Sequence, residues 1–145
     1  MRSIGEGKIG RFKVDLELAN YQDMARAMSG DLDPAKVRRL RIPGMVDSGA
    51  ARVVLPAAVV KKLGLAATAK VKVRYADGRS AKRDQVEGVY LELLGRHSVF
   101  NATVEKDRDT ALIGAIVLED LDLLVDCTNQ RLVPRDPKYV ISEIE

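Results

Sequence analysis

The sequence predicts a mostly β domain, with a closed, barrel-like sheet and one or two short helices. Three observations lead to this prediction. Phe12, Val14, Leu16 and Leu18 alternate with mainly charged residues, which is the period of a half-buried strand. The other apolar segments are also short, and glycine or proline turn signals separate them. Segments with helical features are few and short.

In chain order, this first strand is followed by a short helix predicted from Tyr21 to Ser29, which a glycine ends. The segment from Val37 to Val46 is typical of a strand but contains Pro43-Gly44. Because proline provides no N–H for a sheet ladder, we expect this strand to lie at an edge or to carry a bulge. Pro56 to Leu63 is typical of a helix, with proline in its first turn and a glycine directly after it.

The second half of the chain consists mainly of strands. A strand from Val71 to Tyr75 precedes Asp77-Gly78, a strong hairpin signal. A second strand, from Gln85 to Leu94, follows it, and Gly88 indicates a bulge there. The remaining predicted elements are a strand from Ser98 to Val104, a short strand from Ala111 to Ile113, a helix from Ala115 to Leu121, and a hairpin of Leu123–Val125 with Arg131–Val133.

Length and composition indicate one folded domain. The chain has 145 residues, of which 46% are apolar and 31% are charged with both signs mixed. This composition allows a real core and argues against disorder. We expect a single domain over residues 1–145, with a core at about 12–134 and a tail at 135–145.

The net charge of +3 comes from scattered Lys and Arg residues. The densest basic segment, Arg38-Arg39-Leu40-Arg41, has no aromatic platform beside it, so we favour a solvated strand face over a nucleic-acid site. A small basic barrel that binds nucleic acid remains the least favoured alternative. Residues 1–18 contain no apolar core of signal-peptide length, and no run is long enough to span a membrane. With Cys127 as its single cysteine, the protein is expected to be soluble and cytoplasmic.

Metal and nucleophile chemistry have few candidates. His97 is the single histidine, so no zinc-binding spacing exists, and we expect neither a metal nor another cofactor. A Ser/His or Cys/His pair would need His97, which lies in a predicted hairpin turn and is better explained as an exposed structural residue.

One carboxylate stands out. Asp47 follows the apolar pair Met45-Val46 and precedes the small residues Ser48-Gly49-Ala50. Gly49 permits unusual backbone conformations, and Ser48 can form local hydrogen bonds. The chain can therefore turn sharply and hold the carboxylate at the end of a buried strand. On this local pattern alone, an Asx turn without function explains the segment equally well.

The segment Val46-Asp47-Ser48-Gly49-Ala50, followed by an apolar strand, Leu-Pro and a short helix, resembles the active-site motif of the retropepsin-like (retroviral-type) aspartic proteases. Leu112-Ile113-Gly114, which opens a predicted helix, is similar to the family's second signature. The Asp77-Gly78 hairpin lies between them, where the family has its flap. The resemblance covers roughly Phe12 to Pro134 and is closest to the small single-domain enzymes of prokaryotes.

The resemblance implies a retropepsin fold with one lobe per chain and an aspartic endopeptidase activity. Such proteolysis needs two carboxylates that share one proton. The best second candidate, Asp126, is followed by Cys127-Thr128 instead of Ser-Gly, and a hairpin turn explains it better. The second carboxylate is therefore expected from Asp47 of another chain, in a C2 homodimer.

The resemblance also assigns roles to the remaining residues. Ser48 would brace the two loops across the dimer axis, Gly49 would let the backbone approach the carboxylates, and Ala50 would pack behind the loop. Leu112, Ile113 and Gly114 would support this loop from beneath. The flap would span Tyr75 to Ser80, and its substrate-binding residues would be Tyr75, Ala76, Asp77, Gly78 and Arg79. The expected substrate is an extended peptide or protein segment.

Some features depart from the family pattern. The flap tip carries Asp77 and Arg79, whereas the family usually has glycine or apolar residues there. The segment from Tyr21 to Lys36 resembles an insertion relative to the compact viral enzymes. A catalytically silent module of the same fold, which binds peptides or proteins without turnover, is therefore the alternative function.

Overall fold

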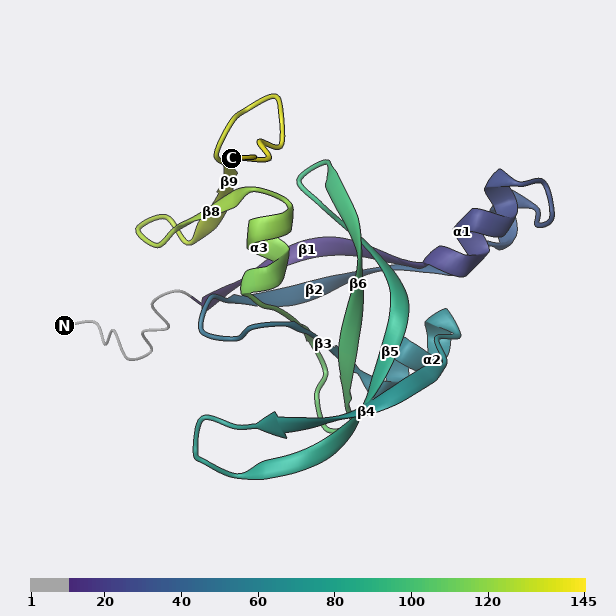
Figure 1. The fold of residues 1–145 in the computed structure, drawn as a ribbon, viewed down its shortest axis with the longest axis horizontal. Helices are drawn as coiled ribbons and strands as arrows, with labels where there is room; N and C mark the ends of the chain where they lie inside the picture. Colours follow the sequence, from purple (N-terminus) through teal and green to yellow (C-terminus); the bar gives the residue numbers. More distant parts are fainter. Residues whose placement is uncertain (1–10) are drawn as a thin grey trace.

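A computed structural model describes residues 11–145 (Figure 1). The first ten residues, which form much of the N-terminal segment considered above, lie outside the described range. The elements in chain order are β1 (Arg11–Asn20), α1 (Tyr21–Met28), η1 (Pro34–Lys36), β2 (Arg39–Asp47), β3 (Val53–Pro56), α2 (Ala57–Leu63), β4 (Ala67–Arg74), β5 (Ser80–Leu93), β6 (Arg96–Glu105), β7 (Ala111–Ile113), α3 (Ala115–Asp120), β8 (Leu123–Asp126) and β9 (Arg131–Pro134).

Seven strands form one sheet in the order β1-β2-β7-β3-β6-β5-β4. An additional antiparallel pairing of β1 with β5 closes this sheet, and β4 remains outside the closed part as the partner of β5 alone. The strands β8 and β9 form a separate antiparallel pair. The described chain is therefore a mostly β, barrel-like single lobe, as the sequence predicted.

The core fills the barrel, and the alternation in β1 explains how it is built. Phe12, Leu16 and Leu18 point inward and are buried, whereas Lys13 and Asp15 are exposed. Inward side chains of the other strands, among them Val46, Leu55, Leu91 and Ile113, are fully buried and complete the cluster. Successive residues of this strand thus face the barrel interior and the solvent in turn.

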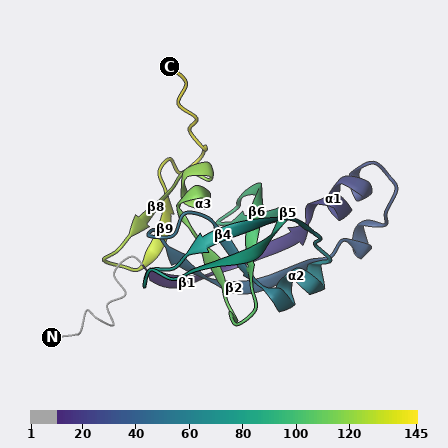
Figure 2. The ribbon, with the colours of Figure 1, turned by 60° about the horizontal axis from the view of Figure 1, so that its bottom comes forward.

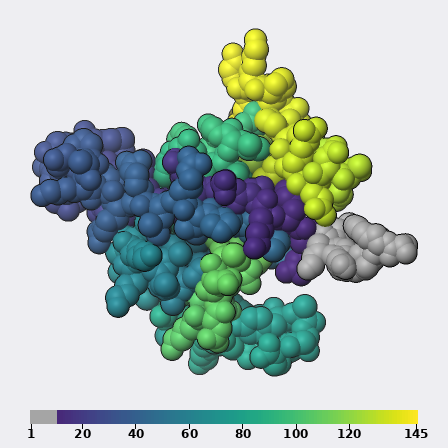
Figure 3. All heavy atoms as spheres, turned by 180° about the vertical axis from the view of Figure 1, so that it is seen from behind, coloured from purple at the N-terminus to yellow at the C-terminus, as the bar shows by residue number. Residues whose placement is uncertain are grey.

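All three segments with helical features are α-helices, one more than the fold class was expected to contain. The helix α2 starts directly after Pro56 and ends at Gly64, whose φ of +67° gives the left-handed cap that glycine favours. Figure 2 shows α1 and the loop after it projecting from one end of the barrel, with α3 and the β8–β9 pair at the other end. From behind, the segment 21–36 and the C-terminal tail form separate protrusions (Figure 3).

Pro43 lies at a partial edge, and the bulge considered for it is absent. β2 pairs with β1 from Arg39 to Asp47 without a register shift. On its other side, β7 pairs with β2 only from Gly44 to Val46, so Pro43 lies where β2 has one neighbour. Gly44 packs closely under two side chains, because a Cβ there would force the ends of the Leu16 and Ile113 side chains to shift.

The β4–β5 hairpin is longer than the sequence indicated. β4 begins at Ala67, where the apolar alternation of Val71 and Val73 continues through alanines alone, and β5 begins at Ser80. These segments are strands because they pair across the hairpin: residues 67–70 lie opposite residues 84–86, and residues 71–74 lie opposite residues 80–83. The bulge predicted at Gly88 is confirmed: the pairing of β5 with β6 shifts between Val86 and Val89, and Gly88 has a φ of +73°.

Candidate active site

The loop from Asp47 to Arg52, called the Asp47 loop below, connects β2 to β3. β7 lies between these two strands in the sheet, with Met45 opposite Leu112 on one side and Val54 opposite Leu112 on the other. The loop therefore passes over the end of β7. This topology brings the two segments that the sequence analysis singled out, 46–50 and 112–114, into direct contact.

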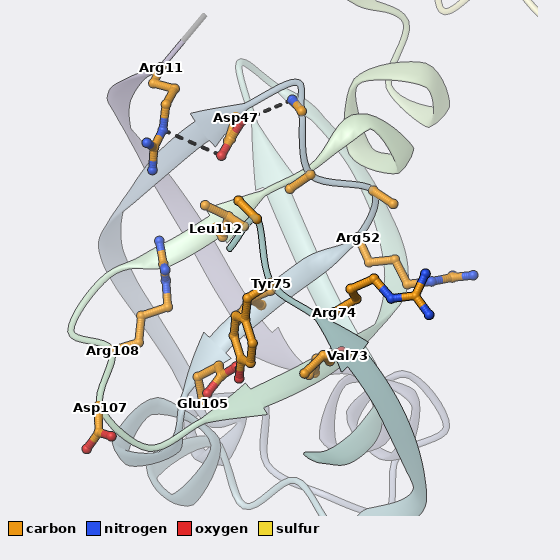
Figure 4. Close-up of a pocket in the computed structure, with 16 residues that line it drawn as sticks. Arg11, Asp47, Arg52, Val73, Arg74, Tyr75, Glu105, Asp107, Arg108 and Leu112 are labelled. Atoms are coloured by element: carbon orange, nitrogen blue, oxygen red, sulfur yellow. Dashed lines mark hydrogen bonds and ion pairs between the residues drawn. The ribbon is translucent and has the colours of Figure 1, made fainter. Parts of the chain in front are cut away.

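The carboxylate of Asp47 is held by its own loop. The backbone N–H of Gly49 donates to Asp47 Oδ1 at 3.0 Å, and that of Ala50 donates to the Asp47 carbonyl at 3.0 Å. The structure thus contains the Asx turn that the local sequence allowed. Arg11, the cross-strand neighbour of Asp47, places its Nε 3.5 Å from Asp47 Oδ2 (Figure 4). Ser48 is exposed beside this carboxylate.

The start of α3 supports the loop from beneath. The N–H groups of Ala115 and Ile116 donate to the carbonyls of Ala50 and Ala51 at 2.8 and 3.0 Å. Gly114 makes this approach possible, since a Cβ on it would lie 2.6 Å from the Arg52 nitrogen. The loop geometry therefore depends on two backbone hydrogen bonds and one glycine.

A groove of about 820 Å³ opens beside Asp47 (Figure 4). The Asp47 loop and β7 form one side, and the end of β4, the β6–β7 connection and the β4–β5 turn form the other. The lining residues are Arg11, Asp47, Gly49, Ala50, Ala51, Arg52, Val54, Val73, Arg74, Tyr75, Ala76, Thr103, Glu105, Asp107, Arg108 and Leu112. Leu112 faces this groove, whereas its neighbour Ile113 is fully buried in the core.

Tyr75 fixes the β4–β5 hairpin to the barrel. Its hydroxyl donates to Glu105 Oε2, and Arg83 Nε donates to the other oxygen of Glu105 at 3.0 Å. The hydrogen bond to Glu105, together with burial, raises the pKa of Tyr75 above its usual value. Figure 4 shows the Tyr75 ring reaching across the groove toward Glu105.

Only part of the predicted flap lines the groove. Tyr75 and Ala76 do so, whereas Asp77, Gly78 and Arg79 lie at the exposed hairpin tip, outside the lining. There Arg79 Nε donates to Asp77 Oδ2 at 2.7 Å, and Gly78 has a φ of +91°. The charges that depart from the family pattern therefore pair with each other at the tip.

Several groove residues have no signal in the sequence. Arg11, Arg52, Arg74, Glu105 and Arg108 look like ordinary surface charges, and only the barrel brings them together. Glu105 comes closest to being predictable, because it ends a strand opposite a tyrosine-bearing hairpin. The contact between Glu105 and this hairpin becomes visible once β6, β5 and β4 are known to lie in this order in the sheet.

The candidates that the sequence analysis rejected have structural roles. Asp126 accepts hydrogen bonds from the Asn129 backbone at 3.2 Å and from Asn129 Nδ2 at 2.9 Å, so it is a hairpin-turn residue as predicted. His97 lies in β6 rather than in the turn, where its exposed ring packs on Tyr90 with centroids 5.3 Å apart. Within residues 11–145, no group of three His, Cys, Asp or Glu side chains is arranged to hold a metal ion.

The family assignment comes from a comparison of the sequence with protein-family profiles. A profile described as aspartyl protease matches residues 34–117, which include both the Asp47 loop and Gly114. The chain belongs to the aspartyl protease family. The Asp47 loop, β7 and the first half of α3 are part of the region that matches this family, and β8, β9 and the tail lie beyond it.

Three solved structures are similar to this member of the aspartyl protease family. The EIAV protease in complex with the inhibitor HBY-793 is 18% identical, with a TM-score of 0.50 over 77% of this chain and 88% of that one. The retroviral protease-like domain of Ddi1 from Leishmania major is 19% identical, with a TM-score of 0.47 over 67% of this chain and 81% of that one. A retropepsin-like aspartic protease from Rickettsia conorii is 17% identical, with a TM-score of 0.46 over 80% and 86%.

Because the EIAV protease is only 18% identical to this chain, its similarity shows a retropepsin-like fold and nothing more specific. No curated protein sequence matches the chain. None of the helices in the described part of the chain has the length and apolar character needed to cross a bilayer.

Proposed function

We propose that this protein is an aspartic endopeptidase whose active site is completed by Asp47 of a second copy. The observation that carries the proposal is the position of Asp47. Its carboxylate lies at the edge of an open groove, in an Asp-Ser-Gly-Ala loop seated on β7 and α3, in a member of the aspartyl protease family.

The need for a second copy follows from the carboxylates of the groove. Besides Asp47, the acidic residues that line it are Glu105 and Asp107. Glu105 is engaged by Tyr75 and Arg83, and the Asp107 side chain points away from Asp47 (Figure 4). Neither can share a proton with Asp47. A two-fold axis beside the exposed Ser48 would bring two Asp47 carboxylates together in an isologous contact.

The proposed chemistry uses one shared proton, since two like charges in close contact cannot both ionise. The ionised Asp47 removes a proton from a water molecule, and the water oxygen attacks the carbonyl carbon of the substrate. The protonated Asp47 of the other copy donates a hydrogen bond to the carbonyl oxygen. When the tetrahedral intermediate breaks its C–N bond, the Asp47 that took the proton from water gives it to the leaving nitrogen, and the pair again holds one proton. One water is consumed, and a new carboxyl and a new amino terminus are formed.

The β4–β5 hairpin would act as the flap. Tyr75 and Ala76 would cover an extended substrate and exclude water, and the exposed edge of β4 could pair with the substrate backbone. Because the hairpin is joined to Glu105 through Tyr75, flap position and groove shape are coupled.

We further propose that residues 1–145 act as one domain in a reducing compartment such as the cytoplasm. The exposed position of Cys127, the single cysteine, supports this assignment because no described residue could form a disulfide with it within one chain.

The test replaces Asp47 with asparagine, which keeps the shape but removes the ionisable group. The wild type should cleave a random peptide library between about pH 4 and 7, and Asp47→Asn should not. Asp126→Asn is the matched control, because Asp126 also follows an apolar strand but serves a turn, and it should retain cleavage. Unchanged cleavage by Asp47→Asn would exclude this mechanism.

Subunit mixing tests the shared active site. An excess of Asp47→Asn protein should suppress the wild-type activity, since mixed dimers contain only one ionisable Asp47. Sedimentation should show a dimer at the concentrations that cleave peptide. A strict monomer that cleaves would contradict the two-chain site. Reversible binding of intact peptides without products would instead favour a silent binding module.

A further inference from the structure

Arginine residues dominate the charge of the groove wall. Arg11, Arg52, Arg74 and Arg108 all line it. Arg11 faces Asp47, and Arg108 donates from Nε to the Thr110 carbonyl at 2.8 Å. Arg52 and Arg74 form no ion pair with any carboxylate within residues 11–145. Two guanidinium groups in the groove are therefore available to a ligand.

These two arginines belong to the parts that would enclose a substrate. Arg52 ends the Asp47 loop, and Arg74 is the last residue of β4, directly before Tyr75. Figure 4 shows their side chains extending in the same direction. Because both line the same groove, an anionic group of a ligand there would meet cations from the Asp47 loop and from the end of the β4 strand.

The acidic residues of the groove do not neutralise this pair. Asp47 is the proposed reacting group, Glu105 is engaged by Tyr75 and Arg83, and Asp107 points away (Figure 4). Two cations without a carboxylate partner leave the groove wall positively charged, and a bound anion offsets that charge. Hydrogen bonds between a guanidinium and a carboxylate are among the stronger ones in proteins, and their geometry is specific.

We propose that Arg52 and Arg74 form a subsite for an acidic side chain, so that the groove selects peptides with Glu or Asp close to the scissile bond. As a statement about cleavage, this inference rests on the proposed function. As a statement about peptide recognition, it stands on the groove charges alone.

The cleavage experiment uses a random peptide library and compares matched peptides that differ only in Glu or Gln at one position. The wild type should cleave the Glu peptide roughly 10-fold faster in kcat/KM at one subsite, as expected for a charge-assisted hydrogen bond. Arg52→Gln and Arg74→Gln should each reduce this preference, and the double variant Arg52→Glu/Arg74→Glu should favour Lys there.

Lys72→Gln is the matched control, since Lys72 is an exposed cation on the same strand as Arg74 but outside the groove lining, and it should keep the preference. A wild type without acidic preference, or a preference that survives the double variant, would overturn the proposal.

A binding experiment separates this proposal from the proposed function. Fluorescent versions of the same Glu and Gln peptides are titrated onto Asp47→Asn protein, and affinity is measured by anisotropy at low and high salt. Tighter binding of the Glu peptide, weakened by salt and lost in Arg52→Gln/Arg74→Gln, would support the subsite even if the wild type cleaves nothing. Equal binding of both peptides would overturn the subsite even if the wild type is an active protease.

Discussion

Gly114 and Arg52 are in backbone contact: a Cβ on Gly114 would lie 2.6 Å from the Arg52 nitrogen. This contact and the backbone hydrogen bonds from Ala115 to Ala50 and from Ile116 to Ala51 hold the Asp47 loop against the start of α3. The two signature segments of the sequence are therefore one structural unit.

Gly114→Ala should destabilise the protein. The new methyl group has no space against the Arg52 and Ala51 backbone, and overpacking of this kind typically costs about 1–3 kcal/mol. The measurement is the urea midpoint of unfolding, which should fall without a change in slope. An unchanged midpoint would show that the loop is not seated on α3 in this way.

Gly49→Ala should affect activity more than stability. A Cβ on Gly49 would meet only Asp47 Oδ1, at 3.2 Å, so the carboxylate rather than the fold must shift. We expect an unfolding midpoint close to that of the wild type and a clear loss of kcat. If Gly49→Ala lowers the unfolding midpoint as much as Gly114→Ala does, Gly49 supports the fold rather than the position of the carboxylate, and this prediction is wrong.

The sequence could predict the elements whose signals are local. The alternation in β1, the Asp77-Gly78 turn, the Gly88 bulge and the Gly64 helix cap all follow from the residues at those positions. The neighbourhood of Asp47 and Gly114 came from a family resemblance instead, because their contact depends on β7 lying between β2 and β3.

Features decided by tertiary pairing could not be predicted. The start of β4 alternates only Ala67 and Ala69, which favour strands weakly, with polar residues, and its pairing with β5 makes it a strand. Arg52 and Arg74 each look like surface cations, and their common groove results from folding. The Tyr75–Glu105 hydrogen bond likewise joins the β4–β5 turn to the end of β6, and these segments come together only in the folded sheet.

Asp23→Asn should destabilise the protein in a pH-dependent way. The Asp23 carboxylate is buried and accepts hydrogen bonds from the Arg38 backbone N–H, Nε and Nη2. These bonds, above all those from the Arg38 side chain, lower the pKa of Asp23 below its ordinary value of 3.8. Because the folded pKa is the lower one, the stabilisation is complete above pH ~4 and is lost as the pH falls through the lowered pKa.

Unfolding experiments at several pH values test this pair. Near neutral pH, Asp23→Asn should cost roughly 1.5–3 kcal/mol, the usual range for hydrogen bonds to a charged group. The difference from the wild type should shrink in acid. Asp77→Asn is the control, since the Asp77–Arg79 pair at the hairpin tip is solvent-exposed and its loss should have a smaller effect. If the difference in stability between Asp23→Asn and the wild type stays constant with pH, the role given to the Asp23–Arg38 pair is wrong.

Tyr75→Phe should loosen the flap. The variant lacks the hydroxyl that donates to Glu105, so amide hydrogen exchange should become faster in β4 and the first half of β5 but not in the barrel core. The raised pKa of Tyr75 means that this bond is present below the ordinary value of 10.0 and is lost as the pH rises through the raised one. Tyr90→Phe is the control: burial raises the pKa of Tyr90 to about 12, so its replacement should remove that titration step and leave flap exchange unchanged.

Arg96→Lys should release the C-terminal tail. The Arg96 guanidinium donates to the carbonyls of Leu121 and Asp122 at 2.9 and 3.0 Å, and also to those of Asp136 and Tyr139 in the tail. Lysine has one nitrogen and cannot satisfy four carbonyls from two directions. Limited proteolysis should therefore cut the variant faster after residue 134, while Arg131→Lys, which changes only a surface pair with Asp126, should be cut like the wild type.

If the tail also contributes to the dimer, Arg96→Lys will sediment as monomer at a higher concentration than the control. Equal cleavage of both variants would mean that Arg96 does not hold the tail.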